Sequence, residues 1–351
     1  MTSHVEIRTK RFAWPQGRRH GRATLRASAP EVPMPRPRLL AVVLLLAVAL
    51  PACAAEAPAR RLAITIDDLP IAQISQHTPA QQETITVRIL AALAAHRAQA
   101  VGFVNTGKLE VEGAVDPARE ALLRRWLAAG CELGNHTRRH PSLHQVEPAV
   151  WKADVVAGEA PLKALVEAAG GRLRWFRHPY LHIGLSAEVQ ATTAAFLAAR
   201  GYTVAPVTLD NSDWLYARAH TKAWNAGDAA AARRLGEDYL RYMLSVVEFY
   251  EGQAELIVGR AIPQILLIHA NALNADWLAP FLDALAARGY DFIALEEALA
   301  DPVYARPADG YTGGGGITWL HRWAITAKLD RAILQGEPEV PAWVEALAEA
   351  P

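Results

Sequence analysis

The segment Leu62-Ala63-Ile64-Thr65-Ile66-Asp67-Asp68-Leu69-Pro70 decides the fold. Its first five residues form a short, mostly apolar run, which is typical of a buried strand. Two adjacent carboxylates, Asp67 and Asp68, end this run. They cannot both be buried and charged without a large cost unless a cation lies beside them. A lone aspartate would indicate a turn or a helix cap, but a pair at the end of a strand favours a functional site.

Strand-like and helix-like segments alternate along the rest of the chain. The predicted strands cover 62–66, 100–104, 132–135, 173–176, 202–208, 264–269 and 292–295. The predicted helices cover 79–96, 117–129, 147–169, 187–200, 228–259 and 276–288. This alternation predicts parallel βαβ units. Because no G-x-G-x-x-G follows the first strand, we expect a distorted or incomplete (β/α) barrel of about seven parallel strands rather than an open nucleotide-binding sheet.

Length, composition and charge limit the class of protein. The chain has 351 residues, of which 52% are hydrophobic and 21% charged, which suits a large packed α/β domain. Its formal net charge is +0, but residues 1–54 hold nine of the 36 basic and two of the 36 acidic residues. The remaining 27 basic and 34 acidic residues make the bulk of the protein acidic. This balance argues against a nucleic-acid partner.

The N-terminal region has the order of a secretory signal. A short basic stretch, a twelve-residue apolar run and a segment of small residues follow one another over 34–57. The apolar run is too short to span a bilayer. We expect 1–33 to be a non-native or disordered extension, 34–57 a signal peptide, and 58–351 an exported catalytic domain in the periplasm or cell envelope. Lipidation of Cys53 is the alternative, and it is the one route by which we expect membrane association.

The segment Asn135-His136-Thr137-Arg138-Arg139-His140-Pro141 is the sharpest signal for a metal. On one helical turn, residues four apart place their side chains on the same face, so His136 and His140 could share one ion. A lone histidine would more simply be a structural residue. Beside the carboxylate pair, the two histidines indicate a site of two histidines and one carboxylate.

Three further polar segments follow predicted strands. They are Arg177-His178-Pro179-Tyr180, Asp210-Asn211-Ser212-Asp213-Trp214 and Leu266-Leu267-Ile268-His269. Each alone could be a surface ion pair, a turn acid, a core tryptophan or a strand-end histidine. Active sites of α/β barrels are built at this end of the strands, so the five segments together indicate one shared site. Six further histidines have no spacing partner and are interpreted as surface or structural residues: His77, His96, His144, His182, His220 and His321.

In order, the chain carries T-I-D-D, H-T-x-x-H-P, R-H-P-Y, D-x-x-D-W and L-I-H. In these five motifs it resembles the polysaccharide deacetylases, carbohydrate esterase family four. The resemblance runs from about Leu62 to about Leu299. It implies a divalent metal, usually zinc in this family, with cobalt or another divalent ion as the alternative. The metal ligands it implies are Asp68, His136 and His140.

The resemblance also implies the residues that transfer protons and contact the substrate. Asp67 would be the general base and Arg177 its partner, while His269 would be the general acid, oriented by Asp213. The implied reaction is hydrolysis of an N-acetyl group of an N-acetylated carbohydrate polymer or oligomer by metal-bound water. The acetyl group would be received by the backbone N–H of Tyr180 and by a pocket walled by Trp214 and Leu267.

The chain departs from the family pattern in several places. Leu69 stands where glycine is common, and Ala270 follows His269 where an aspartate is frequent. A helical insertion is expected at 216–262, and a C-terminal extension at 301–351 contains four successive glycines without the Lys-Ser/Thr of a phosphate-binding loop. The segment Trp319-Leu320-His321-Arg322-Trp323 could add a wall to the pocket or equally pack in the core. An O-acetyl ester or another acyl amide remains the alternative substrate, and a non-catalytic carbohydrate-binding protein the alternative class.

Overall fold

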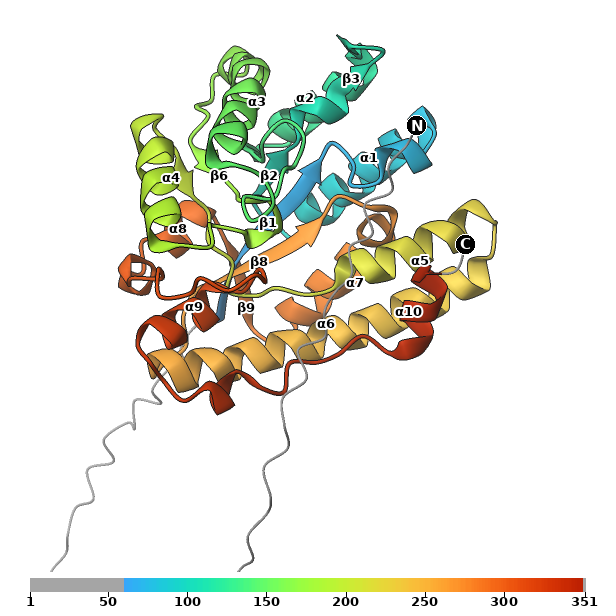
Figure 1. Ribbon diagram of the computed structural model, residues 1–351. Coiled ribbons are helices and arrows are strands. Elements are labelled where there is room, and N and C mark those ends of the chain that lie inside the picture. The colour runs from blue at the N-terminus through green and yellow to red at the C-terminus, as the bar shows by residue number, and fades with distance from the viewer. Residues whose placement is uncertain (1–59, 350–351) are drawn as a thin grey trace, which may run out of the picture. The chain divides into compact units, whose positions relative to one another are not determined.

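The computed structural model describes residues 60–349 of the chain. The predicted extension at 1–33 and the predicted signal peptide at 34–57, with Cys53, lie outside the described residues. A seven-stranded parallel sheet stands at the centre and helices surround it (Figure 1). Its strands are β1 (Arg60–Leu69), β2 (Ala100–Val104), β5 (Glu132–Asn135), β6 (Trp175–Phe176), β7 (Thr203–Val204), β8 (Gln264–His269) and β9 (Tyr290–Ile293).

The helices that match predicted ranges alternate with the strands, as the sequence predicts. They are α1 (Pro79–Ala95), α2 (Pro117–Ala128), α3 (Pro148–Ala168), α4 (Ala187–Ala199), α6 (Ala229–Val258) and α7 (Ala272–Ala286). Further helices lie outside the predicted helix ranges: α5 (Asp213–Asn225), α8 (Leu295–Leu299), α9 (Trp319–Thr326) and α10 (Ala342–Glu349). Short 3₁₀ turns lie between them at η1 (Ile74–Gln76), η2 (Thr106–Leu109), η3 (Pro179–Leu181), η4 (Pro302–Ala305) and η5 (Arg331–Leu334).

The sheet curls around β1. The strand order is β7-β6-β5-β2-β1-β8, and β9 pairs with the first residues of β1. Just beyond β7, Leu209 forms a parallel bridge with Leu266 of β8, so the two ends of the sheet approach each other. The result is an incomplete (β/α) barrel, which confirms the predicted fold class. In such a barrel the carboxyl ends of all strands converge on one mouth.

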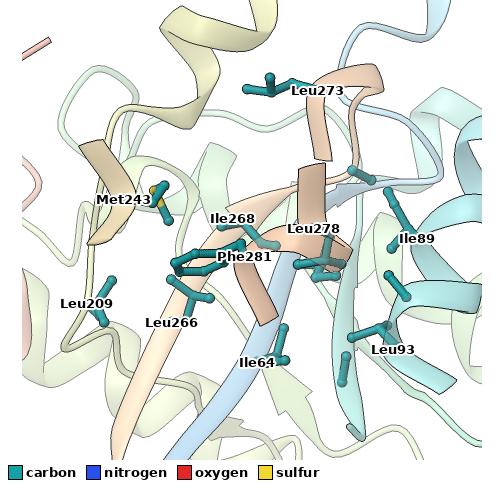
Figure 2. Close-up of a cluster of buried hydrophobic side chains, with 14 of the residues drawn as sticks. Ile64, Ile89, Leu93, Leu209, Met243, Leu266, Ile268, Leu273, Leu278 and Phe281 are labelled. Carbon is teal, nitrogen blue, oxygen red and sulfur yellow. The ribbon is translucent and has the colours of Figure 1, made fainter. Parts of the chain in front are cut away.

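An apolar core between the sheet and helices α1, α6 and α7 fixes the two central strands. Figure 2 shows side chains of β1 and β8 facing side chains from these helices. Burying each such side chain stabilises the fold by roughly 1.5–3 kcal/mol. The positions of the carboxylates and the histidine at the ends of β1 and β8 are therefore set by rigid elements. The core residues labelled in Figure 2 include Ile64, Ile89, Leu93, Met243, Leu266, Ile268, Leu278 and Phe281, all at most 2% exposed.

Several element boundaries differ from the sequence-based expectation. The strand predicted over 202–208 is only β7, because Pro206 has no N–H to continue the ladder. Helix α7 begins at Ala272 instead of 276, because the side chain of Asn271 caps it by accepting from the N–H of Asn274 at 2.8 Å. A hairpin of two-residue strands, β3 (Glu110–Val111) and β4 (Ala114–Val115), was not predicted, since such short strands show no period.

The segment 216–262 is occupied by most of α5 and by the long helix α6, which lie side by side in Figure 1. The side chain of Asp228 caps the start of α6 by accepting from Ala231, and Gly259, at φ 84°, ends it. Buried tyrosines at 216, 239 and 242 pack α5 against α6. Within 60–349, no helix has both the length and the hydropathy to cross a membrane.

Candidate active site

The carboxylate pair lies on a bulge at the end of β1. The register between β1 and β2 shifts between Ile66 and Leu69, and Asp68 has a left-handed backbone with φ 70°. In a regular strand, neighbouring side chains point to opposite faces. The bulge lets both carboxylates turn toward one point, so that Asp67 Oδ2 and Asp68 Oδ1 each lie 3.8 Å from Nε2 of His136.

The histidine pair follows β5, but on a bend and not on the helical turn that the spacing predicted. Thr137 and His140 have φ values of 67° and 61°. Asn135 Oδ1 accepts from the N–H of Thr137 at 2.8 Å, and Thr137 Oγ1 accepts from the N–H of His140 at 3.0 Å. These side-chain bonds replace helical backbone bonds, which makes the predicted turn wrong. The bend nevertheless brings the Nε2 atoms of His136 and His140 within 3.1 Å of each other.

Both imidazoles are set up to offer lone pairs. Nδ1 of His136 lies 2.8 Å from the carbonyl oxygen of Arg177. A carbonyl can only accept, so Nδ1 carries the proton and Nε2 is free to act as a ligand. Burial lowers the pKa of His136 well below its usual value, and that of His140 to about 4. The neutral imidazole, which is the ligand form, therefore prevails at neutral pH.

Asp68, His136 and His140 fit a divalent metal. One ligand atom from each lies within 4.8 Å of the others. Oδ1 of Asp68 is buried, has no hydrogen-bond partner, and lies 3.6 Å from Nε2 of His140. Although burial opposes ionisation, Lys108 and the histidines hold the pKa of Asp68 well below its usual range. Two imidazoles and one carboxylate are a donor set that zinc and similar ions accept.

The predicted base, Asp67, lies beside the metal ligands and faces Arg177. Its Oδ2 is 3.9 Å from Nη1 of Arg177. The Arg177 side chain is fully buried, and its Nη2 donates to Oγ1 of Thr65 at 2.8 Å. Burial raises the pKa of Asp67 to about 6, even though Arg177 lowers it. A cation at the neighbouring ligands would add a second positive charge and lower this pKa further toward the usual carboxylate range.

The predicted acid, His269, ends β8 and is the register partner of Asp67 on β1. Its Nδ1 lies 2.7 Å from Oδ1 of Asp213, and its backbone N–H donates to Oδ2 of Asp213 at 2.9 Å. Asp213, the first residue of α5, is fully buried and also accepts from Asn271 and Asn274. Burial disfavours a charged imidazole, but Asp213 outweighs it and raises the pKa of His269 to about 9.

The predicted substrate-contacting residues differ in burial and in the side chains that they contact. Tyr180, in η3, stacks edge-on against the ring of His140 at 4.4 Å, so its turn adjoins the metal ligands. Leu267 is buried in a small apolar cluster with Leu181 and Val207, and the side chain at 319 packs against that cluster. Trp214, on the first turn of α5, is 38% exposed. Whether it and Leu267 receive an acetyl group stays a prediction.

Two charged residues near these groups have no role in the sequence-based account. Lys108 lies 3.4 Å from Oδ2 of Asp68 and donates to the carbonyl of Asp68 at 3.0 Å. Burial raises the pKa of Asp210 to about 6, although the charges of His269 and Arg177 lower it. The charge of Asp210 in turn raises the pKa of Asp67. Lys108 and Asp210 each follow a predicted strand within a few residues, as the other site residues do. That shared position in the sequence is the signal that could have identified them.

Comparison with known proteins supports part of this picture. Residues 54–205 match the family model described as polysaccharide deacetylase, a range that contains the first three motifs but neither Asp213 nor His269. A comparison with curated proteins found no match.

Among solved structures, a mutant of the CE4 family pseudoenzyme BA3943 from Bacillus anthracis, with restored enzymatic activity, is 18% identical and has a TM-score of 0.45 over 70% of this chain and 69% of that chain. The Bc1960 peptidoglycan N-acetylglucosamine deacetylase is 19% identical, with a TM-score of 0.44 over 68% of this chain and 87% of its own. A family 4 carbohydrate esterase from Streptomyces lividans is 19% identical, with a TM-score of 0.41 over 69% and 96%.

Proposed function

The chain carries a polysaccharide deacetylase domain over residues 54–205, and on that premise we propose that it is a metal-dependent hydrolase of N-acetyl groups on a carbohydrate polymer or oligomer. The observation that carries this proposal is the pairing of Asp67 with His269. A buried carboxylate and a histidine of raised pKa are register partners on adjacent strands, beside three side chains whose donor atoms converge. Such a pair can remove one proton and supply another on either side of a bound group.

The proton transfers follow from the environments of the two residues. Asp67 must be ionised to accept a proton from the attacking water molecule, and Arg177 stabilises that form. His269 must be protonated to donate to the leaving nitrogen, and Asp213 keeps it so up to a pH of about 9. Because an amine anion is a very poor leaving group, this donated proton is required for amide cleavage.

Three further elements of the site fit an acyl substrate. A divalent ion held by Asp68, His136 and His140 would activate the water and polarise the acetyl carbonyl. The ring of Tyr180 packs edge-on against His140, and we propose that the backbone N–H of Tyr180 in the same turn donates to the oxygen of the tetrahedral intermediate. The apolar cluster around Leu267 would accept the methyl group.

Acetate release tests the proposal directly. The purified protein, stripped of metal and reloaded with zinc or cobalt, is offered N-acetylated oligosaccharides, peptidoglycan and O-acetylated sugars, and free acetate is measured. We expect release from an N-acetylated substrate only after reloading, and at least a hundredfold less with Asp67→Asn. Release from O-acetyl sugars alone would favour the esterase alternative. No release from any substrate by metal-loaded protein would contradict the proposal.

For the N-terminal region we propose export, on the sequence pattern at 34–57 alone. A mature chain that starts between residues 54 and 58 is expected in the cell envelope, and N-terminal sequencing of native material checks this. An acylated Cys53 would instead favour a membrane-anchored lipoprotein.

A further inference from the structure

A strained turn adjoins the proposed metal centre. In η3, Tyr180 and Leu181 both have left-handed backbones, with φ values of 59° and 54°. For residues other than glycine, this conformation is sterically unfavourable. Such strain persists only where surrounding contacts impose it. The side chain of Tyr180 is 45% exposed, so its own packing is a weak constraint.

One constraint is the burial of Leu181 in its apolar cluster, and a second comes from the C-terminal extension, through Arg322 of α9. This side chain is fully buried, and its Nη2 donates to the carbonyl oxygen of Leu181 at 2.8 Å. Its guanidinium lies over the rings of Tyr311 and Trp319, at 5.4 and 5.3 Å from their centroids. Burying a guanidinium is costly unless its hydrogen bonds are made. The one hydrogen bond that the described residues give the Arg322 side chain goes to the strained turn, since its Nε and Nη1 are buried without a partner.

The glycine run of the same extension closes on the other carbonyl of the turn. A Cβ atom built on Gly316 would lie 2.0 Å from the carbonyl oxygen of Tyr180, far inside any allowed contact. Only glycine therefore permits the chain to pass so close. Gly314, two residues earlier, is different, because a Cβ there would meet nothing within 4 Å. The close contact with Tyr180 therefore requires glycine at 316, the last residue of the run, but not at 314.

We infer that Gly316 and Arg322 are positioning residues that hold the Tyr180–Leu181 turn, so that the N–H of Tyr180 faces the developing oxyanion. This inference rests on the proposed function, because it assigns a role within that reaction. It also makes the C-terminal extension, which lies outside the segment 54–205 that matches the family model, a part of the active site. Gly316, the last glycine of a run that does not form a phosphate-binding loop, then serves close backbone approach.

Two alanine variants within one glycine run test the inference. Loss of a whole oxyanion donor costs about 10²–10³ in kcat. We expect Gly316→Ala, which displaces the donor but does not delete it, to lower kcat about ten- to a hundredfold with little change in KM. Gly314→Ala, the matched control, should leave both constants within about twofold of the wild type. Rates are normalised to bound metal, and thermal unfolding of each variant checks that it is folded.

A tetrahedral inhibitor separates positioning from a loss of active molecules. A methylphosphonamidate analogue of the N-acetyl group carries an anionic oxygen where the oxyanion forms. Its inhibition constant does not depend on the active fraction, and it should rise for Gly316→Ala in parallel with the fall in kcat/KM. Arg322→Lys should keep part of this affinity, because lysine can still donate to Leu181, whereas Arg322→Met should not. If Gly316→Ala does not fold, the arginine pair alone decides.

The outcomes distinguish this inference from the function on which it rests. Equal kcat and equal inhibitor affinity for the two glycine variants, or for the two arginine variants, would overturn the positioning role while the wild-type activity left the proposed function intact. A wild-type protein that releases no acetate would overturn the proposed function and this inference with it.

Discussion

The two sides of the candidate site are built in opposite ways. On the metal side, Asp68, Thr137, His140 and Tyr180 all have left-handed backbones, and Oδ1 of Asp68 is buried without a hydrogen-bond partner. On the proton-donating side, Asp213 begins a regular helix, and its two oxygens accept from His269, Asn271 and Asn274. One side is strained and has unused bonding capacity, as a ligand site needs. The other side is complete within the protein.

This difference explains why the two imidazole groups behave differently. His136 and His140 are buried beside each other with no counter-charge as close as the one His269 has, so their pKa values fall. The His269 side chain is about as exposed as that of His140, 20% against 22%, but it is bonded to a buried carboxylate, so its pKa rises. Burial alone would lower all three. The partner, and not the degree of burial, decides whether a histidine here is a neutral ligand or a charged acid.

The largest effect is expected from removing a ligand on the metal side. His136→Ala should lose nearly all bound metal, because two donors rarely retain an ion that three hold. The measurement is metal content per chain by mass spectrometry after equilibration with zinc. His96→Ala is the matched control, since His96 bonds to Asp283 and to the carbonyl of Ala92 at a distant place. Equal metal content in the two variants would show that the convergent cluster is not a metal site.

The next prediction separates the two carboxylates of β1. Asp67→Asn should keep its metal, because the ligand is Asp68, and should lose about 10²–10⁴ in kcat, the usual contribution of a general base. Metal content and acetate release are measured on the same sample. Loss of metal in this variant would place Asp67 among the ligands, while near-wild-type turnover would exclude it as the base.

These two predictions concern residues that the sequence already singled out. The fold and the paired carboxylates could be predicted because each rests on a local pattern, such as an apolar run ending in two acids. The bend at 136–140 could not, because it depends on hydrogen bonds from the side chains of Asn135 and Thr137. Spacing alone could not distinguish it from a helical turn, since both bring residues four apart together.

Contacts between distant parts of the chain were beyond prediction for a different reason. The bond from Arg322 to Leu181 joins residues 141 apart in the sequence. Neither segment carries a repeating pattern that points to the other. Lys108 beside Asp68 is a similar case, although its place soon after β2 could have suggested it. Only the topology of the sheet, which brings strand ends to one mouth, creates such contacts.

The proton-donating side is tested by changing the leaving group. His269→Ala should lower amide hydrolysis by about 10²–10⁴ and hydrolysis of an acetyl ester by much less, since an alkoxide leaves more easily than an amine anion. Asp213→Asn should move the alkaline limb of the pH–rate profile down from about 9, because the carboxylate that raises the pKa of His269 is lost. Steady-state rates from pH 5 to 10 on both substrates measure this. Equal losses for amide and ester would contradict the acid role.

The smallest effect concerns stability, for which the two sides should respond to pH in opposite directions. His269 has a folded-state pKa above the unfolded value of 6.5. Its pairing with Asp213 therefore stabilises the fold fully below about pH 6.5, and this contribution is lost as the pH rises through 9. Immediately before η3, the turn that adjoins the metal side, His178 is buried in parallel stacking on Trp151, and burial lowers its pKa to about 3. Above about pH 6.5 His178 is neutral in both the folded and the unfolded state, and as the pH falls below 6.5 the unfolded state gains a proton first, so the fold loses stability.

The acid response of His178 can be measured against a variant that cannot titrate. At pH 5, an unfolded histidine is protonated and the folded one is not, which costs about 2 kcal/mol relative to pH 7. In His178→Phe, whose ring can keep the stacking on Trp151, the fall in unfolding free energy from pH 7 to pH 5 should be smaller by about that amount. Urea unfolding of metal-free protein at both pH values gives the slope, and the absolute stabilities are not compared. An equal fall in unfolding free energy from pH 7 to pH 5 in variant and wild type would mean that His178 is already protonated in the folded protein at pH 5. Burial without a carboxylate partner would then not suffice to keep this histidine neutral.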